Sequence, residues 1–518
     1  MKTAIIIGAG HNGLVTAFYL AKAGVKPVVL EARPEVGGGA ITTEIHPGFR
    51  CPALTHEVLL QQRVVQEMDL GRHGLALLDS PVRTCSLSSS GPLVVYDDAR
   101  KTQESIGSFN SRDAAAYPEF RSAIEQCASV LASTFEYSPP PIDRPKAGDI
   151  WNLLKTGRAF RALGRRGGHR LLRWGPMPVA DLVREWFDHD LVRSTLAAPA
   201  LTGTMLGPRS AGSSLVLLMR EAHRRLAGRA ELTAKGGPGA VTQALSSAAR
   251  AAGAELRTST PVSEIVVRGN EVRGVIAGGR TLDADVVISS ADPKTTFLKL
   301  IEPSALSPDF AGKMQNYRAA GTVAKVNLAL ASLPAFDSPK ETLTGRILIA
   351  NDLDYLERAF DHAKYGEFSE RPWLELTIPS LLDASLAPAG AHVASIYVHY
   401  APRGLRAGWS DTTREALLAA VLGVLEDHAP GLRRTVLAAQ VITPLDMERE
   451  HGLAGGHIFH GELALDQLFT MRPLLGHARY ASPVRGLYLC GAGTHPGGFM
   501  TGGSGRLAAQ AALNASEI

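Results

Sequence analysis

The sequence contains few cysteines and no long apolar run. Its 518 residues include four cysteines, Cys51, Cys85, Cys127 and Cys490. No two of them form the C-x-x-C pair of a dithiol redox centre or a zinc cluster, and scattered single thiols suit a reducing cytoplasm. No window reaches the roughly 18 consecutive apolar residues that a membrane-spanning helix needs. We therefore expect a cytoplasmic protein without dithiol chemistry or a membrane span.

An excess of charge of one sign is also absent. Lysine and arginine number 54 against 50 aspartate and glutamate residues, which gives a formal net charge of +4. Such a balance offers no broad basic surface for a phosphate backbone, so no nucleic-acid partner is expected. Hydrophobic residues make up 45% of the chain, as in ordinary globular proteins, and the length suffices for two or more domains.

The N-terminal stretch carries the strongest motif. An apolar run of strand length, Ala4–Ile7, leads into Gly8, Gly10 and Gly13, which are spaced as G-x-G-x-x-G. The first glycine permits a tight turn, the second lets the backbone approach a pyrophosphate, and the third lets a helix pack closely on the strand. This pattern predicts a dinucleotide-binding turn, with the positive end of the next helix facing the phosphates.

The residues that follow complete this unit. Leu14–Ala23 is predicted to be a helix that ends at Gly24, and Val25–Leu30 is a second predicted strand that leads into Glu31. An acid about 20 residues beyond the glycines can bind both hydroxyls of a ribose. Gly37–Gly39 adds a second glycine cluster, which resembles that of many FAD-binding flavoproteins and so favours FAD. A strand that begins this early leaves no room for a cleaved signal peptide.

A later segment has the pattern of a second half of the same domain. Val241–Ala252 is predicted to be a helix, and strands are predicted at Glu255–Thr260, Pro261–Val267 and Ala284–Ser290. A helix followed by strands and a β-hairpin is typical of nucleotide-binding domains in FAD enzymes. Val262 would then place its backbone amide and carbonyl at the adenine edge.

The C-terminal stretch Gly486–Arg506 indicates another cradle. It is predicted to form a strand and a glycine-rich loop, which leads into the helix Leu507–Asn514. A helix N-terminus beside such a loop is a second candidate site for the flavin or an anion. Many FAD enzymes place an acid directly after the first glycine of this loop. Ala492 stands there in this chain, so backbone amides are expected to serve instead.

The segment 150–174 is basic and amphipathic. Seven lysine and arginine residues alternate with leucines, a phenylalanine and two tryptophans. A basic face beside an aromatic and leucine-rich face is typical of a helix in a membrane interface. The alternative is a solvated surface helix, and the internal Gly164, Gly167 and Gly168 weaken any long helix.

Two groups of histidines stand out. His56, next to Glu57, lies close to the predicted cofactor end of the chain, where it could face a flavin or serve as a hydrogen-bonded structural residue. His457 and His460 form an H-x-x-H pattern, but no third ligand follows nearby, so we expect no metal.

The motifs together resemble those of the phytoene desaturase-related FAD-dependent oxidoreductases. The resemblance rests on Gly8-Ala-Gly-His-Asn-Gly13, Gly37-Gly-Gly39 and Gly491-Ala-Gly-Thr-His-Pro-Gly-Gly498 and runs along almost the whole chain. Gly455–His460, Leu465–Leu468 and Arg472-Pro473 are most similar to the branch of desaturase-like carotene ketolases and of pyridine nucleotide-disulfide oxidoreductase domain-containing protein 2. Cys51–His56 departs from the Asp-Ala-Gly of typical phytoene desaturases, which argues against phytoene itself.

The resemblance implies an α/β fold of the amine oxidase and phytoene desaturase type. A discontinuous Rossmann-like FAD-binding domain is expected from residues 1–80, 231–300 and 471–518. An inserted α+β substrate-binding domain is expected from residues 81–230 and 301–470, with 150–174 as the segment that would face a membrane. Peripheral membrane attachment occurs in several family members.

The resemblance also implies the cofactor and the class of reaction. FAD would be held by Gly8, Gly10, His11, Asn12, Gly13, Glu31, Ala32, Arg33, Gly38, Gly39, Ala40, Val262, Gly491, Ala492, Met500 and Thr501. A hydride would pass from an apolar, isoprenoid or carotenoid-like substrate to flavin N5, with His56 and His495 as candidate catalytic residues near the ring. No second G-x-G-x-x-G is present, so quinone or oxygen is expected to reoxidise the flavin.

Two alternatives remain open from the sequence. An FAD-dependent amine oxidase shares the fold, and aromatic residues flanking the flavin would favour it, although aromatics are 6% of this chain. A non-catalytic prenyl-binding protein of the same fold would have a degraded flavin site. The intact Glu31 and both glycine cradles argue against that second alternative.

Overall fold

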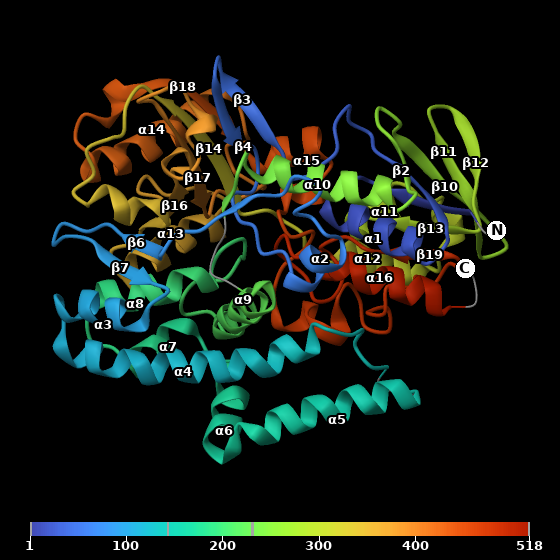
Figure 1. Ribbon diagram of the computed structural model, residues 1–518, viewed down its shortest axis with the longest axis horizontal. Helices are drawn as coiled ribbons and strands as arrows, with labels where there is room; N and C mark the ends of the chain where they lie inside the picture. The colour runs from blue at the N-terminus through green and yellow to red at the C-terminus, as the bar shows by residue number, and fades with distance from the viewer. Residues whose placement is uncertain (1–2, 142–144, 229–232, 516–518) are drawn as a thin grey trace.

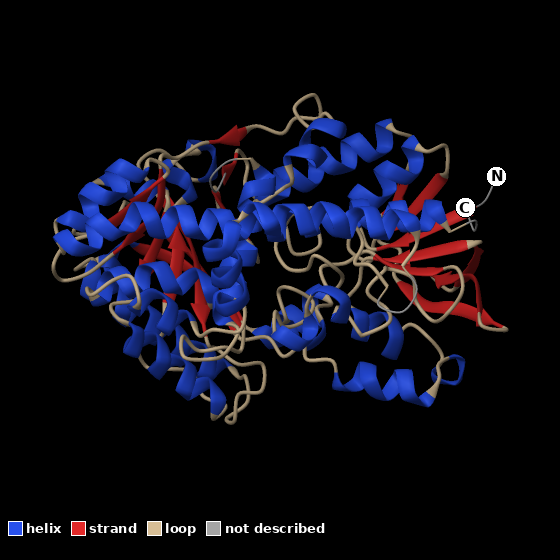
Figure 2. Cartoon of the chain, turned by 90° about the horizontal axis from the view of Figure 1, so that it is seen from below, coloured by secondary structure: helices blue, strands red, loops and turns tan. Residues whose placement is uncertain are grey.

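The computed structural model describes residues 3–141, 145–228 and 233–515. Two groups of β-strands lie at opposite ends of the molecule and are wrapped by helices (Figures 1 and 2). The helices are α1 (His11–Lys22), α2 (Gln62–Glu67), α3 (Ala99–Gly107), α4 (Ser111–Thr134), α5 (Ala147–Ala162), α6 (Gly164–Trp174), α7 (Val179–Arg184), α8 (Asp190–Ala197), α9 (Ser213–Ala227), α10 (Pro238–Ala251), α11 (Pro293–Leu298), α12 (Pro308–Asn316), α13 (Leu353–Lys364), α14 (Asp411–His428), α15 (Pro444–His451) and α16 (Gly503–Asn514).

A parallel five-stranded sheet forms the first group together with a small antiparallel sheet. Its strands, in spatial order, are β19 (Leu487–Leu489), β13 (Val286–Ser289), β1 (Thr3–Ile7), β2 (Lys26–Leu30) and β9 (Glu255–Arg257). Ala4 and Ile6 pack against α1, α10 and α16, whereas Ile5 and Ile7 face the three-stranded sheet β10 (Val262–Arg268), β11 (Glu271–Ala277) and β12 (Arg280–Asp283). Because both faces are covered, the central strand is an uninterrupted apolar run.

A seven-stranded sheet forms the second group. In spatial order its strands are β18 (Val436–Ile442), β14 (Val323–Leu330), β17 (His392–His399), β16 (Leu374–Thr377), β15 (Arg346–Ile349), β6 (Val82–Ser86) and β7 (Leu93–Tyr96). α14 packs on one face, and α8, α9 and α13 contribute to the core on the other. All eight residues of β14 are buried, including Lys325 and Asn327. The remaining strands form two antiparallel pairs, the hairpin of β3 (Thr42–His46) with β4 (Phe49–Pro52) and the long-range pair of β5 (Leu77–Leu78) with β8 (Thr233–Ala234).

The predicted α/β fold class, with its Rossmann-like dinucleotide-binding part, is confirmed. The five parallel strands come from three separate segments of the chain, because β1 and β2, β9 and β13, and β19 are separated by long insertions. The strands of the seven-stranded sheet come from those insertions. The exact domain boundaries 1–80, 231–300 and 471–518 stay a prediction.

The basic segment 150–174 folds as two helices rather than one. Leu163 separates α5 from α6, and Gly164, the first residue of α6, has a φ of +67°. Both helices lie at the edge of the molecule beyond α4 (Figure 1). Ile150, Trp151, Leu153 and Leu154 are exposed on α5. Within the described residues, no helix combines the length and the apolar character required to cross a membrane.

Candidate functional site

The turn between β1 and α1 has backbone geometry that requires glycine. Gly8 has a φ of +91°, and a Cβ atom on Gly13 would lie 2.1 Å from the carbonyl oxygen of Gly8. Gly38 crosses the same turn, since a Cβ there would lie 3.1 Å from the Cα of Gly10. The close packing leaves the amides at the start of α1 available to a bound phosphate.

Glu31 is fixed beside this turn by backbone donors. The carboxylate accepts hydrogen bonds from the amide of Ala9 at 2.7 Å and from the amide of Arg33 at 3.0 Å. The residue is buried at the end of β2. Both carboxylate oxygens are therefore held toward the position where a ribose would lie in a dinucleotide fold.

A second helix N-terminus meets the first one. The amide of Gly505 in α16 donates a hydrogen bond to Asn12 Oδ1 at 3.3 Å, and a Cβ on Gly505 would lie 2.3 Å from the carbonyl oxygen of Asn12. The N-terminal turns of α1 and α16 are thus in direct contact. Their positive ends reinforce one another at this place.

A cavity of about 440 Å³ runs from these glycine turns toward the seven-stranded sheet, a volume within the roughly 300–1,000 Å³ range of pockets for small molecules and cofactors. Most of the predicted cofactor-binding residues line it. They are Gly8, Gly10, His11, Asn12, Glu31, Ala32, Arg33, Gly38, Gly39, Ala40, Val262, Ala492 and Met500.

Three predicted cofactor-binding residues lie behind the lining. Gly13 provides the close turn contact, and a Cβ on Gly491 would lie 2.7 Å from the carbonyl oxygen of Ser290. The hydroxyl of Thr501 accepts a hydrogen bond from the amide of Gly503 at 3.2 Å. These residues shape the cradle, and direct contact of each residue with a cofactor stays a prediction.

The lining fits a dinucleotide cofactor. His11 Nε2 and His460 Nδ1 are buried without a hydrogen-bond partner among the described residues, and both side chains line the cavity. Burial, and then the neighbouring His460, lower the pKa of His11 to about 4. Unpartnered buried nitrogens at a cradle of amides are suited to a ligand that accepts hydrogen bonds, such as a pyrophosphate.

The other end of the cavity, which we call the distal end, is lined by side chains from both of the predicted domains. Thr55, Glu57, Tyr397, Phe459 and Phe499 belong to it. The rings of Phe459 and Phe499 have centroids 4.8 Å apart. Aromatic carbon therefore covers one side of the distal end.

Buried polar side chains lie directly behind the distal end. Lys325 Nζ is 2.9 Å from His56 Nδ1, and His56 Nε2 is 3.3 Å from Glu375 Oε1. Lys325, Tyr397 and Glu375 occupy one row across strands β14, β17 and β16, because Tyr397 is the register partner of both other residues. Lys325 Nζ also lies 4.3 Å from the centre of the Tyr397 ring.

Two arginines extend this network. Arg346 donates to Glu57 at 3.0 Å and lies 3.4 Å from Glu375, and Arg220 from α9 forms a further ion pair with Glu57. We refer to His56, Glu57, Arg220, Lys325, Arg346 and Glu375 as the polar cluster. Of these six residues, Glu57 is the one that lines the cavity described above.

The electrostatics of the polar cluster favour a neutral lysine. Burial lowers the pKa of Lys325 to about 7, although Cys51 and Glu375 act in the opposite direction. Burial and the Lys325 charge lower the pKa of His56 to about 3, so this imidazole is neutral. Burial raises the pKa of Glu375, but Arg346 and the hydrogen bond from His56 outweigh it and keep this carboxyl ionised. An amine that titrates near neutral pH can accept a proton.

The two predicted catalytic histidines occupy different environments. His56 belongs to the polar cluster. His495 is buried outside the lining of the cavity, where its Nε2 is 3.0 Å from the carbonyl oxygen of Thr134. Lys325 and Glu375 were not among the sequence candidates. A lysine in an otherwise apolar strand was the available signal for Lys325, whereas Glu375 joins the cluster through sheet register.

Comparisons with known proteins agree with this geometry. The model of the family described as flavin containing amine oxidoreductase matches residues 179–513, and the model of the NAD(P)-binding Rossmann-like domain matches residues 6–68. Pyridine nucleotide-disulfide oxidoreductase domain-containing protein 2 of Rattus norvegicus is 35% identical over 98% of this chain and 92% of its own length.

The names of two more distant relatives include a substrate. One of the subunits of limonene dehydrogenase from Castellaniella defragrans is 26% identical over 98% of this chain and 93% of its own length. The lycopene-forming phytoene desaturase of Pantoea ananas is 26% identical over the full length of both chains. Among solved structures, cyclohexylamine oxidase from Brevibacterium oxydans aligns over 100% of both chains with a TM-score of 0.58 and 17% identity, which shows the shared fold.

Fold, cavity and comparisons define a flavoprotein of the Rossmann type. FAD is its cofactor. The chain belongs to the family of flavin-containing amine oxidoreductases and is an FAD-dependent oxidoreductase of the amine oxidase and phytoene desaturase superfamily. The resemblance that the sequence motifs indicated is confirmed.

Proposed function

We propose that this oxidoreductase dehydrogenates an apolar, isoprenoid-like substrate. The observation that carries the proposal is the distal end of the cavity, where apolar walls adjoin a buried base. Leu54, Ile458, Phe459 and Phe499 supply aliphatic and aromatic carbon, and the Lys325–His56 pair lies behind Tyr397. Two relatives named for limonene and phytoene, both isoprenoid hydrocarbons, support the same substrate class.

Bound FAD would supply the oxidant by accepting a hydride at N5. This chain would supply orientation, exclusion of water and a proton acceptor. Lys325 is the proposed base, because its neutral amine can take the proton that leaves when a double bond forms. His56 Nδ1 would accept a hydrogen bond from the Lys325 amine at 2.9 Å and so orient it, and Glu375 would stabilise the charge that develops on the lysine. Quinone or oxygen is the proposed acceptor that returns the flavin to its oxidised state.

Amine oxidation is the second candidate, and one observation favours it. Phe459 and Phe499 form an aromatic pair that lines the cavity, and the face of an aromatic ring attracts an amine cation. Against this candidate, Glu57 and Glu375 at the distal end are engaged by Arg220 and Arg346. The cavity therefore offers a cationic amine little negative charge.

We also propose that α5 and α6 rest on an anionic membrane surface that delivers the substrate. Trp151 and Leu154 are 61% and 56% exposed on α5, and Leu172 is 66% exposed on α6. Arg158, Arg161, Arg165 and Arg166 are exposed on the same two helices. Exposed apolar side chains among cations match the two requirements for interfacial binding.

Vesicle sedimentation tests this surface. Vesicles of phosphatidylglycerol and phosphatidylcholine should retain the protein, and the double variant Trp151→Ser, Leu154→Ser should stay in the supernatant. Leu437→Ser is the matched control, because Leu437 is 50% exposed on β18, in the other half of the molecule. Equal retention of all three proteins would refute the proposal that α5 and α6 bind the membrane.

Anaerobic mixing of the FAD-loaded protein with a substrate panel tests the reaction. The panel contains monoterpenes, longer isoprenoids and primary and secondary amines. Bleaching of the flavin absorbance by isoprenoids, with a dehydrogenated product in mass spectrometry, is the expected result. Bleaching by amines alone would replace this proposal with the second candidate.

A further inference from the structure

A second pocket lies on the far side of the polar cluster from the flavin cavity. Its volume is about 90 Å³, well below the roughly 300–1,000 Å³ of pockets for larger ligands. β6 and β15 of the seven-stranded sheet form one wall, and α4, α8 and α9 form the others. A site of this size suits a small ligand.

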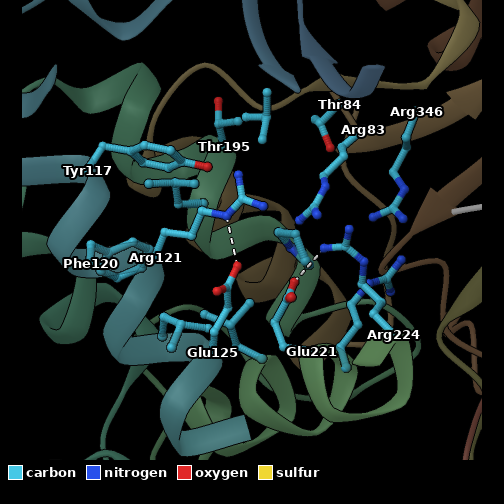
Figure 3. Close-up of a pocket in the computed structure, with 16 residues that line it drawn as sticks. Arg83, Thr84, Tyr117, Phe120, Arg121, Glu125, Thr195, Glu221, Arg224 and Arg346 are labelled. Atoms are coloured by element: carbon cyan, nitrogen blue, oxygen red, sulfur yellow. Dashed lines mark hydrogen bonds and ion pairs between the residues drawn. The ribbon is translucent and has the colours of Figure 1, made fainter. Parts of the chain in front are cut away.

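Arginines dominate the polar part of this pocket. Five of them line it, Arg83, Arg121, Arg220, Arg224 and Arg346, against two glutamates, Glu125 and Glu221. Figure 3 shows the guanidinium groups of Arg83, Arg224 and Arg346 gathered at one side of the pocket, with Arg121 and Tyr117 approaching from α4. Guanidinium groups bind carboxylates and phosphates through paired hydrogen bonds.

The positive charges crowd one another. Burial lowers the pKa of Arg83, and the charge of Arg224 lowers it further, although Glu221 and Asp97 counteract this. Arg224 donates from Nη1 to Glu221 at 2.7 Å, but its Nε is buried and has no hydrogen-bond partner among the described residues. The Arg224 side chain is 11% exposed. A buried charged donor without an acceptor is costly, and an anion would relieve that cost.

The other half of the pocket is apolar. Phe120, Ile124, Leu196 and Leu217 contribute aromatic and aliphatic carbon to its walls. An inorganic anion would leave these walls without a partner. A small organic acid satisfies both halves, because its carboxylate faces the guanidinium groups and its hydrocarbon part contacts the walls.

We propose that this pocket binds a short aliphatic carboxylic acid through Arg83 and Arg224. The acid is a separate ligand and not one end of the oxidised substrate, because Arg220 and Arg346, with their partner Glu57, stand between the pocket and the flavin cavity. The proposal goes beyond the proposed function, since binding requires no turnover.

Calorimetric titration of the FAD-loaded protein with butyrate is the first test. Butyrate should bind saturably, whereas butyramide, of the same shape without charge, should not. Arg83→Gln and Arg224→Gln should each weaken butyrate binding about tenfold or more, as expected for loss of a charge-assisted hydrogen bond. Arg280→Gln is the control, because Arg280 is exposed on β12, and it should bind butyrate like the unchanged protein.

Further measurements separate this result from misfolding and from other ligands. The visible FAD spectrum should be the same in all variants, and Arg224→Lys should bind better than Arg224→Gln. Absence of butyrate binding, undiminished binding in both glutamine variants, or tighter binding of inorganic phosphate would overturn the proposal. Anaerobic bleaching of the flavin by butyrate would show that the acid is the substrate and would overturn the separate site.

Discussion

At its nucleotide end the flavin cavity is built from backbone, whereas at its distal end it is built from side chains. Gly8, Gly13 and Gly38 act by having no side chain, and Glu31 is held by two backbone amides. The distal end instead depends on ionisable groups brought together from β14, β16 and α9. Cofactor binding and chemistry should therefore fail independently in this protein.

Gly13→Ala should break the nucleotide end most severely. Its Cβ would lie 2.1 Å from the carbonyl oxygen of Gly8, so α1 must move away from β1. We expect loss of bound flavin and a decrease in the free energy of unfolding of about 1–3 kcal/mol, typical of overpacking. The flavin content of the purified protein measures the loss of cofactor, and urea denaturation measures the decrease in the free energy of unfolding. Gly71→Ala, at an open exposed position, should retain the flavin, and a yellow Gly13→Ala protein would contradict the packing argument.

Lys325→Met should break the distal end while sparing the cofactor. The flavin content should stay normal, and the rate of flavin reduction should fall by about 10²–10⁴-fold, the usual contribution of a general base. Stopped-flow absorbance with a substrate found in the panel measures this rate. Lys26→Met, at an exposed position on β2, is the control. If the flavin of Lys325→Met were reduced at the unchanged rate, Lys325 would not be the base.

The pH dependence sharpens this prediction. Because a neutral amine is required, the reduction rate should rise as the pH increases through about 7, the pKa to which burial lowers Lys325. The folded protein binds fewer protons at Lys325 than the unfolded chain between about pH 7 and the ordinary lysine value of 10.5, so this group makes stability rise with pH in that window. In Lys325→Met, the reduction rate should no longer rise through about pH 7, and the contribution of Lys325 to the rise of stability with pH should be absent.

Glu31→Gln should weaken FAD binding to a smaller extent. The amide offers one acceptor oxygen in place of two, so it can bind only one of the two ribose hydroxyls that an acid at this position binds in dinucleotide-binding folds. Loss of a bond to a charged group costs about 1.5–3 kcal/mol, which corresponds to about ten- to a hundredfold in the dissociation constant. Fluorescence titration of the apoprotein with FAD measures this change. Glu35→Gln, at an exposed position, should bind FAD normally.

His56→Gln and His495→Gln compare two histidines that the sequence could not rank. His56 contacts Lys325, so its replacement should slow flavin reduction about tenfold and shift the pH profile, as expected for a group that assists proton transfer. His495 contacts the carbonyl of Thr134 and lies outside the lining. Its replacement should lower the thermal midpoint with little change in rate. If His495→Gln slowed flavin reduction and His56→Gln did not, His495 rather than His56 would take part in the reaction.

Prediction from the sequence succeeded where function depends on local backbone. The motif Gly8–Gly13, the acid Glu31 and the loop before α16 are each contiguous, and their spacing alone indicates a strand, a turn and a helix start. The segment 150–174 shows the limit, because its amphipathic character and its three helix-weakening glycines were visible, but not that the interruption occurs at Gly164 rather than at Gly167 or Gly168. A glycine can be accommodated within a helix or end it, and packing decides between the two outcomes.

The class of cofactor and the parallel sheet that presents it could be predicted from the sequence, because both follow from glycine geometry and strand periodicity within short stretches. Only the tertiary structure decided which ionisable residues meet. Lys325 and Glu375 lie 50 positions apart and share one row through the register of Tyr397. Register is fixed by the packing of whole sheets, so a pattern within one strand carries no information about its partner.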